Sequence, residues 1–121
     1  MQVQINTDHS VKVHDSESAQ LLRIVEGAVS RFEKDITRVE MHLSDENAAG
    51  GSPDDKRCLL EARLKGRKPL AVSHLADSVI LAVEGAAEKL ARSIESDVGR
   101  RAAIHKHQAG PLLDESEIEN E

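Results

Sequence analysis

The chain has 121 residues and a formal net charge of -6 at pH 7, with 16 lysines and arginines against 22 aspartates and glutamates. This length predicts one domain, which can bury enough surface to fold without a disulfide or a metal. The single cysteine, Cys58, excludes an internal disulfide and favours a reducing compartment. Phe32 is the only aromatic residue, which excludes nucleic-acid binding by base stacking on several rings.

The sequence shows no sign of membrane insertion or secretion. No apolar run approaches the ~18 residues of a membrane-spanning helix. The first ten residues lack the basic and apolar regions of a signal peptide. We therefore expect a cytoplasmic protein that contacts no membrane.

The charge is divided unevenly along the chain. Residues 1–55 hold 5 basic and 11 acidic residues, and residues 56–106 hold 11 basic and 6 acidic ones. Residues 107–121 hold five acids and no lysine or arginine. A net-acidic chain binds nucleic acid poorly without a local basic surface, so phosphate binding is to be sought in such patches.

The first half of the chain predicts a strand, a helix and a second strand. Residues 2–6 alternate polar and apolar side chains, as a strand with one apolar face does. A helix over roughly residues 16–34 follows, with Asp15 or Ser16 as its N-cap. Its apolar stripe is formed by Leu21, Val25, Ala28, Val29 and Phe32. Residues 36–44 alternate again and predict the second strand.

A loop and a hairpin come next. Residues 45–55 contain glycines, Pro53 and four acids, a composition typical of a mobile loop. Residues 56–65 alternate as a third strand, and residues 66–67 suit a two-residue turn. Leu70 and Val72 continue as a fourth strand, with Pro69 at its start or on an edge.

A long helix and a charged tail complete the chain. Apolar residues repeat at spacings of three and four from about His74 to at least Val98, which predicts a second helix. Residues 107–121 are rich in charge and poor in apolar groups, so we expect them to be disordered. We place the folded domain at residues 1–106.

These elements predict an α+β fold. Strands with one apolar face need a cover on that face alone, and two amphipathic helices can supply it. The expected architecture is a two-layer β-α-β-β-β-α sandwich, a four-stranded sheet with both helices on one face. The other face of the sheet would be solvated and carry Arg38, Arg57, Arg63 and Lys65.

Basic residues gather opposite the apolar stripe of each predicted helix. They are Arg23, Arg31 and Lys34 in the first helix, and Lys89, Arg92 and Arg100 in the second. If the helices lie antiparallel and side by side, these sectors merge into one basic ridge that can bind phosphates. An ordinary solvated face, with Glu88 paired to Arg92 four residues later, explains the same spacing.

Two further charged segments each allow two interpretations. The segment from Lys56 to Lys68 holds six basic residues and one acid. It can bind phosphates, or it can serve solubility and protect a sheet edge by charge. The acidic residues 107–121 can act as a solvating tail, or as an intramolecular competitor that lies on the basic ridge.

Catalysis has little support in the sequence. The six histidines show no metal-binding spacing, and His105 and His107 lack a third ligand nearby. Cys58 falls on the predicted apolar face, where a buried structural thiol is expected rather than a nucleophile. No glycine-rich phosphate loop is present. We expect no enzymatic activity, no cofactor and no metal.

Several segments, in this order, resemble the ribosome hibernation-promoting factor and ribosome-associated inhibitor family, formerly called sigma modulation proteins. Residues Gln2–Val13, QVQINTDHSVKV, resemble the family's opening strand and turn. Residues Ala28–Lys34, AVSRFEK, and Arg38–Glu46, RVEMHLSDE, resemble the end of its first helix and its second strand. Residues Ala82–Ile94, AVEGAAEKLARSI, resemble its most recognisable segment, and Gly99–Ala103, GRRAA, with the acidic end is similar to the inhibitor branch.

The resemblance implies both a fold and a function. Family members bind the small ribosomal subunit in the channel for messenger and transfer RNA, and they silence translation in stationary phase or stress. Their fold is similar to a double-stranded-RNA-binding domain, which contacts shape and phosphate rather than bases. The chain matches the short form, without the module that pairs ribosomes in long members, so we expect it not to pair ribosomes by itself.

We therefore predict a monomeric translation inhibitor whose partners are the small ribosomal subunit and its ribosomal RNA, and which binds no DNA. The residues expected to contact RNA are Arg23, Arg31, Lys34, Arg57, Arg63, Lys65, Lys89, Arg92, Arg100 and Arg101. The rival hypothesis is a regulatory protein of the same fold that binds a protein partner through acidic surfaces. RNA binding weakens steeply with salt, which separates the two.

Overall fold

A computed structural model describes residues 1–46 and 56–109, the last ten of these by their backbone alone. The predicted 45–55 loop and the predicted disordered tail therefore lie largely outside the described residues. The elements are β1 (Gln2–Thr7), α1 (Asp15–Val29), the 3-10 helix η1 (Ser30–Asp35), β2 (Ile36–Asp45), β3 (Lys56–Leu64), β4 (Leu70–Ala76) and α2 (Val79–Ala109).

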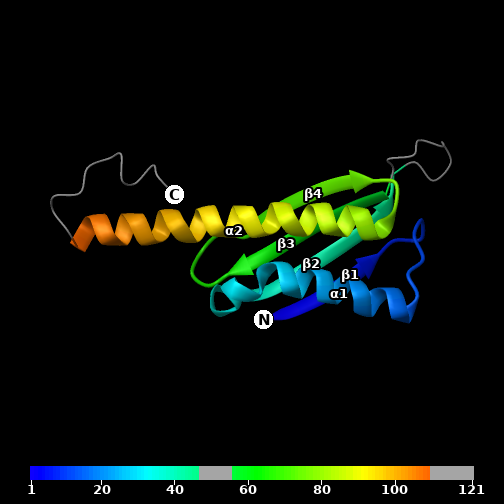
Figure 1. Cartoon of the computed structure of the whole chain (residues 1–121), viewed down its shortest axis with the longest axis horizontal. Coiled ribbons are helices and arrows are strands. Elements are labelled where there is room, and N and C mark those ends of the chain that lie inside the picture. The colour runs from blue at the N-terminus through cyan, green and yellow to red at the C-terminus, as the bar shows by residue number, and fades with distance from the viewer. Residues whose placement is uncertain (47–55, 110–121) are drawn as a thin grey trace.

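The four strands form one mixed sheet in the order β1-β2-β3-β4. Strand β1 pairs with β2 in parallel, and the pairs β2–β3 and β3–β4 are antiparallel. Both helices cover the same face of this sheet, as Figure 1 shows. The predicted two-layer α+β sandwich is confirmed.

The two helices run in the same direction, not antiparallel as expected (Figure 1). The parallel pairing of β1 with β2 requires α1 to carry the chain back across the sheet. The two antiparallel pairings that follow bring α2 back in the same sense. The continuous basic ridge was expected only for antiparallel helices, and the structure does not meet this condition.

The core lies between the helices and one face of the sheet. The apolar positions of the strands and the stripes of the helices are fully buried there, the largest side chains being Leu21, Ile36, Met41, Leu60, Leu90 and Ile94. Each such side chain stabilises the fold by about 1.5–3 kcal/mol through removal from water. Alternation in the strands and the spacing of three and four in the helices placed these residues correctly except Ile36. It is out of phase with Met41, and the register shift between Ile36 and Arg38 brings it to the buried face.

Helix α1 begins at Asp15, one residue before the predicted start, and ends at Val29, five residues before the predicted end. His14 is its N-cap, and the His14 backbone N–H donates to the Glu17 carboxylate at 3.3 Å. The chain then tightens into η1, which buries Phe32 against the core. The predicted helix over 16–34 is thus an α-helix followed by a 3-10 helix.

The start of α2 was predicted wrongly. His74 belongs to β4, which continues to Ala76, and the helix begins at Val79. Ser78 caps it, because its hydroxyl accepts from the Leu81 N–H at 3.2 Å and its carbonyl accepts from Ala82 at 3.0 Å. At the other end α2 continues to Ala109, so the predicted domain boundary at residue 106 falls within the helix.

Candidate nucleic-acid interface

The basic candidates occupy three separate surfaces. Arg23, Arg31 and Lys34 lie on α1 and η1, Lys89 and Arg92 lie on α2, and Arg57, Arg63 and Lys65 lie on or just after β3. The backbones of Arg100 and Arg101 belong to α2, but their side chains lie outside the described residues. Each surface has its own surroundings, which decide whether its cations are available to a phosphate.

On the first surface, Arg31 is already held by an acid. Its guanidinium contacts the Glu95 carboxylate of α2 at 2.5 Å, with both side chains 62% exposed. The same guanidinium lies 4.7 Å from the centre of the Phe32 ring, a cation–π arrangement. Arg23 and Lys34 are exposed and form no ion pair within the described part of the chain.

On the second surface, Lys89 and Arg92 lie toward β4. The Lys89 ammonium donates to the backbone carbonyl of Ser73 in β4 at 2.9 Å. Arg92 contacts the carboxylate of Glu88 one turn earlier, the pair that the spacing predicted. Arg31 contacts the side of α2 that faces α1. Lys89 extends from the opposite side of α2, which faces β4. The basic residues of the two helices therefore form two flanks and not one continuous ridge.

On the third surface, the outer face of the sheet, arginines alternate with carboxylates. Arg57 contacts Glu46 at 3.3 Å, and Arg63 lies 3.9 Å from Glu40. Glu40 also lies 3.5 Å from Arg38, which was expected on this face. Lys65 follows β3, and its backbone N–H donates to the backbone carbonyl of Asp35 at 2.9 Å. This face presents no uninterrupted positive patch.

The β3–β4 hairpin joins the third surface to α2. Gly66 adopts φ 66, a left-handed conformation that glycine takes without strain. The predicted two-residue turn at 66–67 was wrong, because residues 65–69 join β3 to β4 and the Arg67 N–H donates to the Leu64 carbonyl at 3.4 Å around Lys65 and Gly66. Arg67 then turns inward, where its Nε lies 2.7 Å from the carboxylate of Asp97, the one buried charged residue among those described. Arg67 thus anchors the hairpin to the helix, and Lys68 beside it is exposed.

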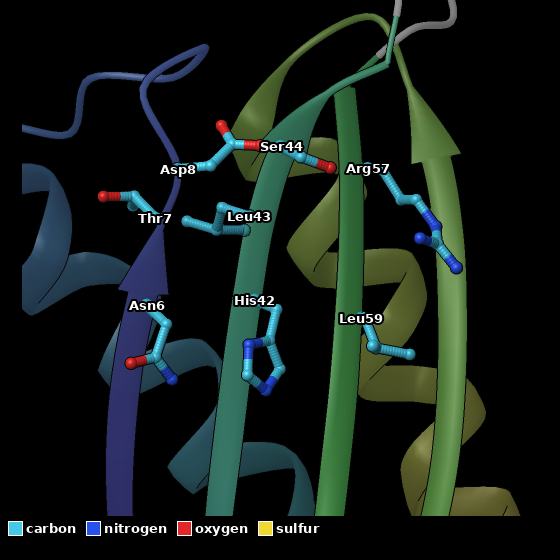
Figure 2. A pocket seen from close by; sticks show the side chains of 8 residues that line it. All are labelled: Asn6, Thr7, Asp8, His42, Leu43, Ser44, Arg57 and Leu59. Carbon is cyan, nitrogen blue, oxygen red and sulfur yellow. The ribbon is translucent and has the colours of Figure 1, made fainter.

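A hollow of about 230 Å³ lies on the outer face of the sheet, and no motif or spacing in the sequence predicted it. It is lined by Asn6, Thr7, Asp8, His42, Leu43, Ser44, Arg57 and Leu59. Figure 2 shows Asn6, His42 and Leu59 in one row across β1, β2 and β3, and Arg57 extending away from Asp8. The register that builds the row pairs Asn6 with His42 and His42 with Leu59. Asp8 and Arg57 therefore do not converge in the hollow.

Asp8 instead organises the turn after β1. Its carboxylate accepts from the N–H of Ser10 at 2.8 Å and from the Ser10 hydroxyl. These hydrogen bonds lower the pKa of Asp8, because they favour its charged form. The Ser10 hydroxyl in turn accepts from the backbone N–H of Asp45 at 2.9 Å, which ties the turn to the end of β2.

Two other classes of site are not found in the described part of the chain. No group of three or more metal-ligating side chains comes together in residues 1–46 and 56–99. Within the same residues, no helix is long and apolar enough to cross a membrane.

Comparison with known proteins reveals likeness in structure alone. No protein-family model and no curated protein sequence matches the chain. A ribosomal subunit interface protein from Coxiella burnetii superposes with a TM-score of 0.60 at 14% identity, over 78% of this chain and 94% of that one. The N-terminal domain of Protein Y from Thermus thermophilus superposes with a TM-score of 0.53 at 14% identity, over 77% of this chain and 91% of that one. The chain therefore shares the fold of these two proteins.

Proposed function

We propose that this protein is a ribosome-associated translation inhibitor. It binds ribosomal RNA of the small subunit in the messenger and transfer RNA channel, under stress or in stationary phase. The observation that carries the proposal is the likeness to a ribosomal subunit interface protein, which covers nearly the whole of that chain. The order of segments in the sequence that resembles the same family supports it independently.

The proposed binding mode is contact with the phosphate backbone. The chain has one aromatic residue, so it lacks the rings for stacking on bases. Arginine and lysine side chains on a rigid two-layer scaffold suit recognition of shape and phosphate. The contacts that we propose are made by the ten basic residues named from the sequence, on the helix flanks and on the outer face of the sheet.

Ion pairs at these positions do not prevent phosphate binding. Arg31 and Glu95 are both largely exposed, and so are Arg92 and Glu88. Exposed pairs of this kind contribute about 0.2–1 kcal/mol, so a phosphate can replace the carboxylate at low cost. Arg23 and Lys34, which have no ion pair within the described residues, offer the first contacts.

Co-sedimentation with purified small ribosomal subunits on a sucrose gradient tests the proposal. We expect the protein to travel with the subunit and to leave it as salt rises, because several phosphate contacts are lost together. Reversing two charges, Lys89→Glu with Arg92→Glu, should abolish co-sedimentation and leave the melting temperature nearly unchanged.

The matched control changes the same net charge elsewhere. Lys12→Glu, compared with Lys89→Glu alone, changes the same charge at an exposed lysine that lies outside the predicted contacts and outside the basic segment from Lys56 to Lys68. This variant should still travel with the subunit. If the Lys89 and Arg92 variant also does so, the flank of α2 is a solvated face and the predicted contacts there are wrong.

One observation favours the rival function, in which this protein binds a protein partner through its acidic surfaces. Glu84, Glu88 and Glu95 are exposed and lie in one line along α2 at helical spacings of four and seven. A partner held there would be lost on reversal of these glutamates, whereas binding to ribosomal RNA would be retained or strengthened.

A further inference from the structure

Strand β4 has one open edge. It is the last strand of the sheet within the described residues, and β3 occupies its other side. Ser73 directs its carbonyl outward to Lys89, and backbone groups alternate along a strand. Ala71, Ser73 and Leu75 therefore direct their N–H and C=O groups toward this edge. Figure 1 shows β4 as the outer strand of the sheet.

The flank of α2 above this edge is basic and polar. Gly85, Lys89, Ser93 and Ser96 follow one another there at spacings of four, four and three, and Arg92 lies next to Ser93. Arg92, Ser93 and Ser96 border a hollow of about 330 Å³ with Leu70 of β4. Leu70 also borders a second hollow, of about 390 Å³, together with Gly66, Arg67, Lys68 and Asp97. An open strand edge and a line of cations thus lie side by side.

The acidic side of α2 is turned away from β4. Glu95 reaches toward η1, where it contacts Arg31, and Glu84 and Glu88 follow the same line of the helix. The positive charge on the β4 side comes from Lys89, Arg92 and, at the hairpin, Lys68, and the exposed Asp77 at the far end of β4 is the acid beside it. A ligand that complements this groove carries negative charge and can also pair with a strand.

We propose that this groove binds an extended acidic segment of a partner protein, which adds to the sheet as a strand beside β4. Main-chain hydrogen bonds to Ala71, Ser73 and Leu75 hold the segment in register. Its carboxylates contact Lys89 and Arg92 above, and its small side chains fill the hollow beside Leu70. This interface shares Lys89 and Arg92 with the proposed ribosomal RNA contacts, and it is separate from those on α1 and on the outer face of the sheet.

Lys89 gives the edge its selectivity. In the free protein its ammonium donates a hydrogen bond to the Ser73 carbonyl. This contact protects the edge against pairing with neutral strands, a common use of lysine at sheet edges. A carboxylate of the incoming segment offers the ammonium a stronger, charge-assisted partner. Ser73 is then released to accept a main-chain N–H from the bound segment.

The first experiment separates strand pairing from simple charge attraction. The probe is a seven-residue peptide that alternates glutamate and valine, matched to the length of β4. Ala71→Pro removes an outward N–H without disturbing the bonds to β3, a place where an edge strand tolerates proline. We expect it to weaken peptide binding about tenfold in a fluorescence titration, while Ala71→Thr, which keeps the N–H, binds normally. Equal affinity of the two variants would overturn the proposal.

The second experiment tests the selectivity. Lys89→Glu should lose about tenfold in affinity for the glutamate peptide and gain a similar factor for its lysine counterpart. Unchanged preference would show that Lys89 does not select the segment. Co-sedimentation of Ala71→Pro with small subunits should equal that of the wild type, so that failure here is distinguished from failure of ribosome binding.

Other occupants of the edge have their own signatures. If the chain's own acidic residues 107–121 occupy it, replacing their acids by amides in the full chain raises peptide affinity about tenfold at physiological salt. If a second copy occupies it, sedimentation shows a dimer that Ala71→Pro abolishes. If RNA occupies the strand edge itself, Ala71→Pro weakens the binding of single-stranded RNA and leaves that of the peptide unchanged. Each of these results would overturn the proposal.

Discussion

At the scale of single residues, Cys58 illustrates how burial controls chemistry. It lies on the inner face of β3 with no exposed surface, and burial raises the pKa of its thiol to about 12. A thiol that stays protonated is a poor nucleophile, so the structural role expected from the sequence is confirmed in its location. Native protein should react with a disulfide reagent at pH 8 at least ~100-fold more slowly than protein unfolded in denaturant. Equal rates would contradict this burial.

The same thiol makes stability depend on pH. In the unfolded chain it loses its proton near pH 8.5, whereas in the fold it keeps the proton up to about pH 12. The unfolded state therefore binds fewer protons at high pH, and stability falls as pH rises above about 8.5. Denaturant titrations at pH 7 and pH 10 should show a loss of about 2 kcal/mol in the wild type that is absent in Cys58→Ala.

Gly85 marks a place where α2 approaches β4 closely. A Cβ atom added there would lie 2.1 Å from Cδ2 of His74, so the ring and a side chain at residue 85 cannot coexist unchanged. Alanine gains about 1 kcal/mol in helix propensity, but the clash costs about 1–3 kcal/mol, so Gly85→Ala should destabilise the protein. In a His74→Ala background the same change should become neutral or stabilising. A double-mutant cycle by thermal unfolding measures this coupling.

At the scale of elements, the pair of Arg67 and Asp97 fastens the β3–β4 hairpin to α2. The Asp97 side chain is 12% exposed and that of Arg67 is 24% exposed, at a separation of 2.7 Å. Removing one partner leaves a buried charge, so Asp97→Ala should lower the free energy of unfolding by about 3 kcal/mol. Glu95→Ala, two residues earlier in the same helix, breaks an exposed pair and should cost less than ~1 kcal/mol. Similar losses of unfolding free energy in the two variants would show that the pair of Arg67 and Asp97 contributes no more than the exposed pair of Arg31 and Glu95.

The element order could be read from the sequence because it rests on local periodicity. Alternation defined the strands, and the spacing of three and four defined the helices. The boundary at His74 failed because Leu70, Val72 and His74 alternate toward the helix side, and His74 also fits the start of the helical repeat. Ser78, an N-cap residue, was the signal that should have placed the start of the helix at Val79 and left His74 in the strand.

The relations between elements could not be read in this way. Nothing local in residues 16–34 shows that α1 runs parallel to α2, because the crossover between β1 and β2 decides it. Arg31 and Glu95 are 64 residues apart, so their pairing follows only from the packed fold. For the same reason, the separation of the basic candidates into two flanks of α2 became visible only in three dimensions.

At the scale of the whole molecule, the net charge of -6 opposes the proposed binding to RNA. Five of the acids lie in residues 107–121, beyond the last basic residue of the chain. Replacing these five by amides should raise affinity for RNA most at low salt, where screening is weakest. The difference should vanish near 1 M salt, where charges interact over only about 3 Å.

This measurement also decides between the two roles of the acidic residues. A filter-binding titration of RNA at several salt concentrations gives the affinity and its salt slope for each variant. A competitor for the basic surface makes the affinity of the amide variant much higher at low salt, and a solvating tail leaves it nearly unchanged. A loss of affinity for whole ribosomal subunits, with RNA binding intact, would mean that the acids contact a basic ribosomal protein. In that case their negative charge contributes to binding, and the net charge of the molecule no longer argues against a ribosomal partner.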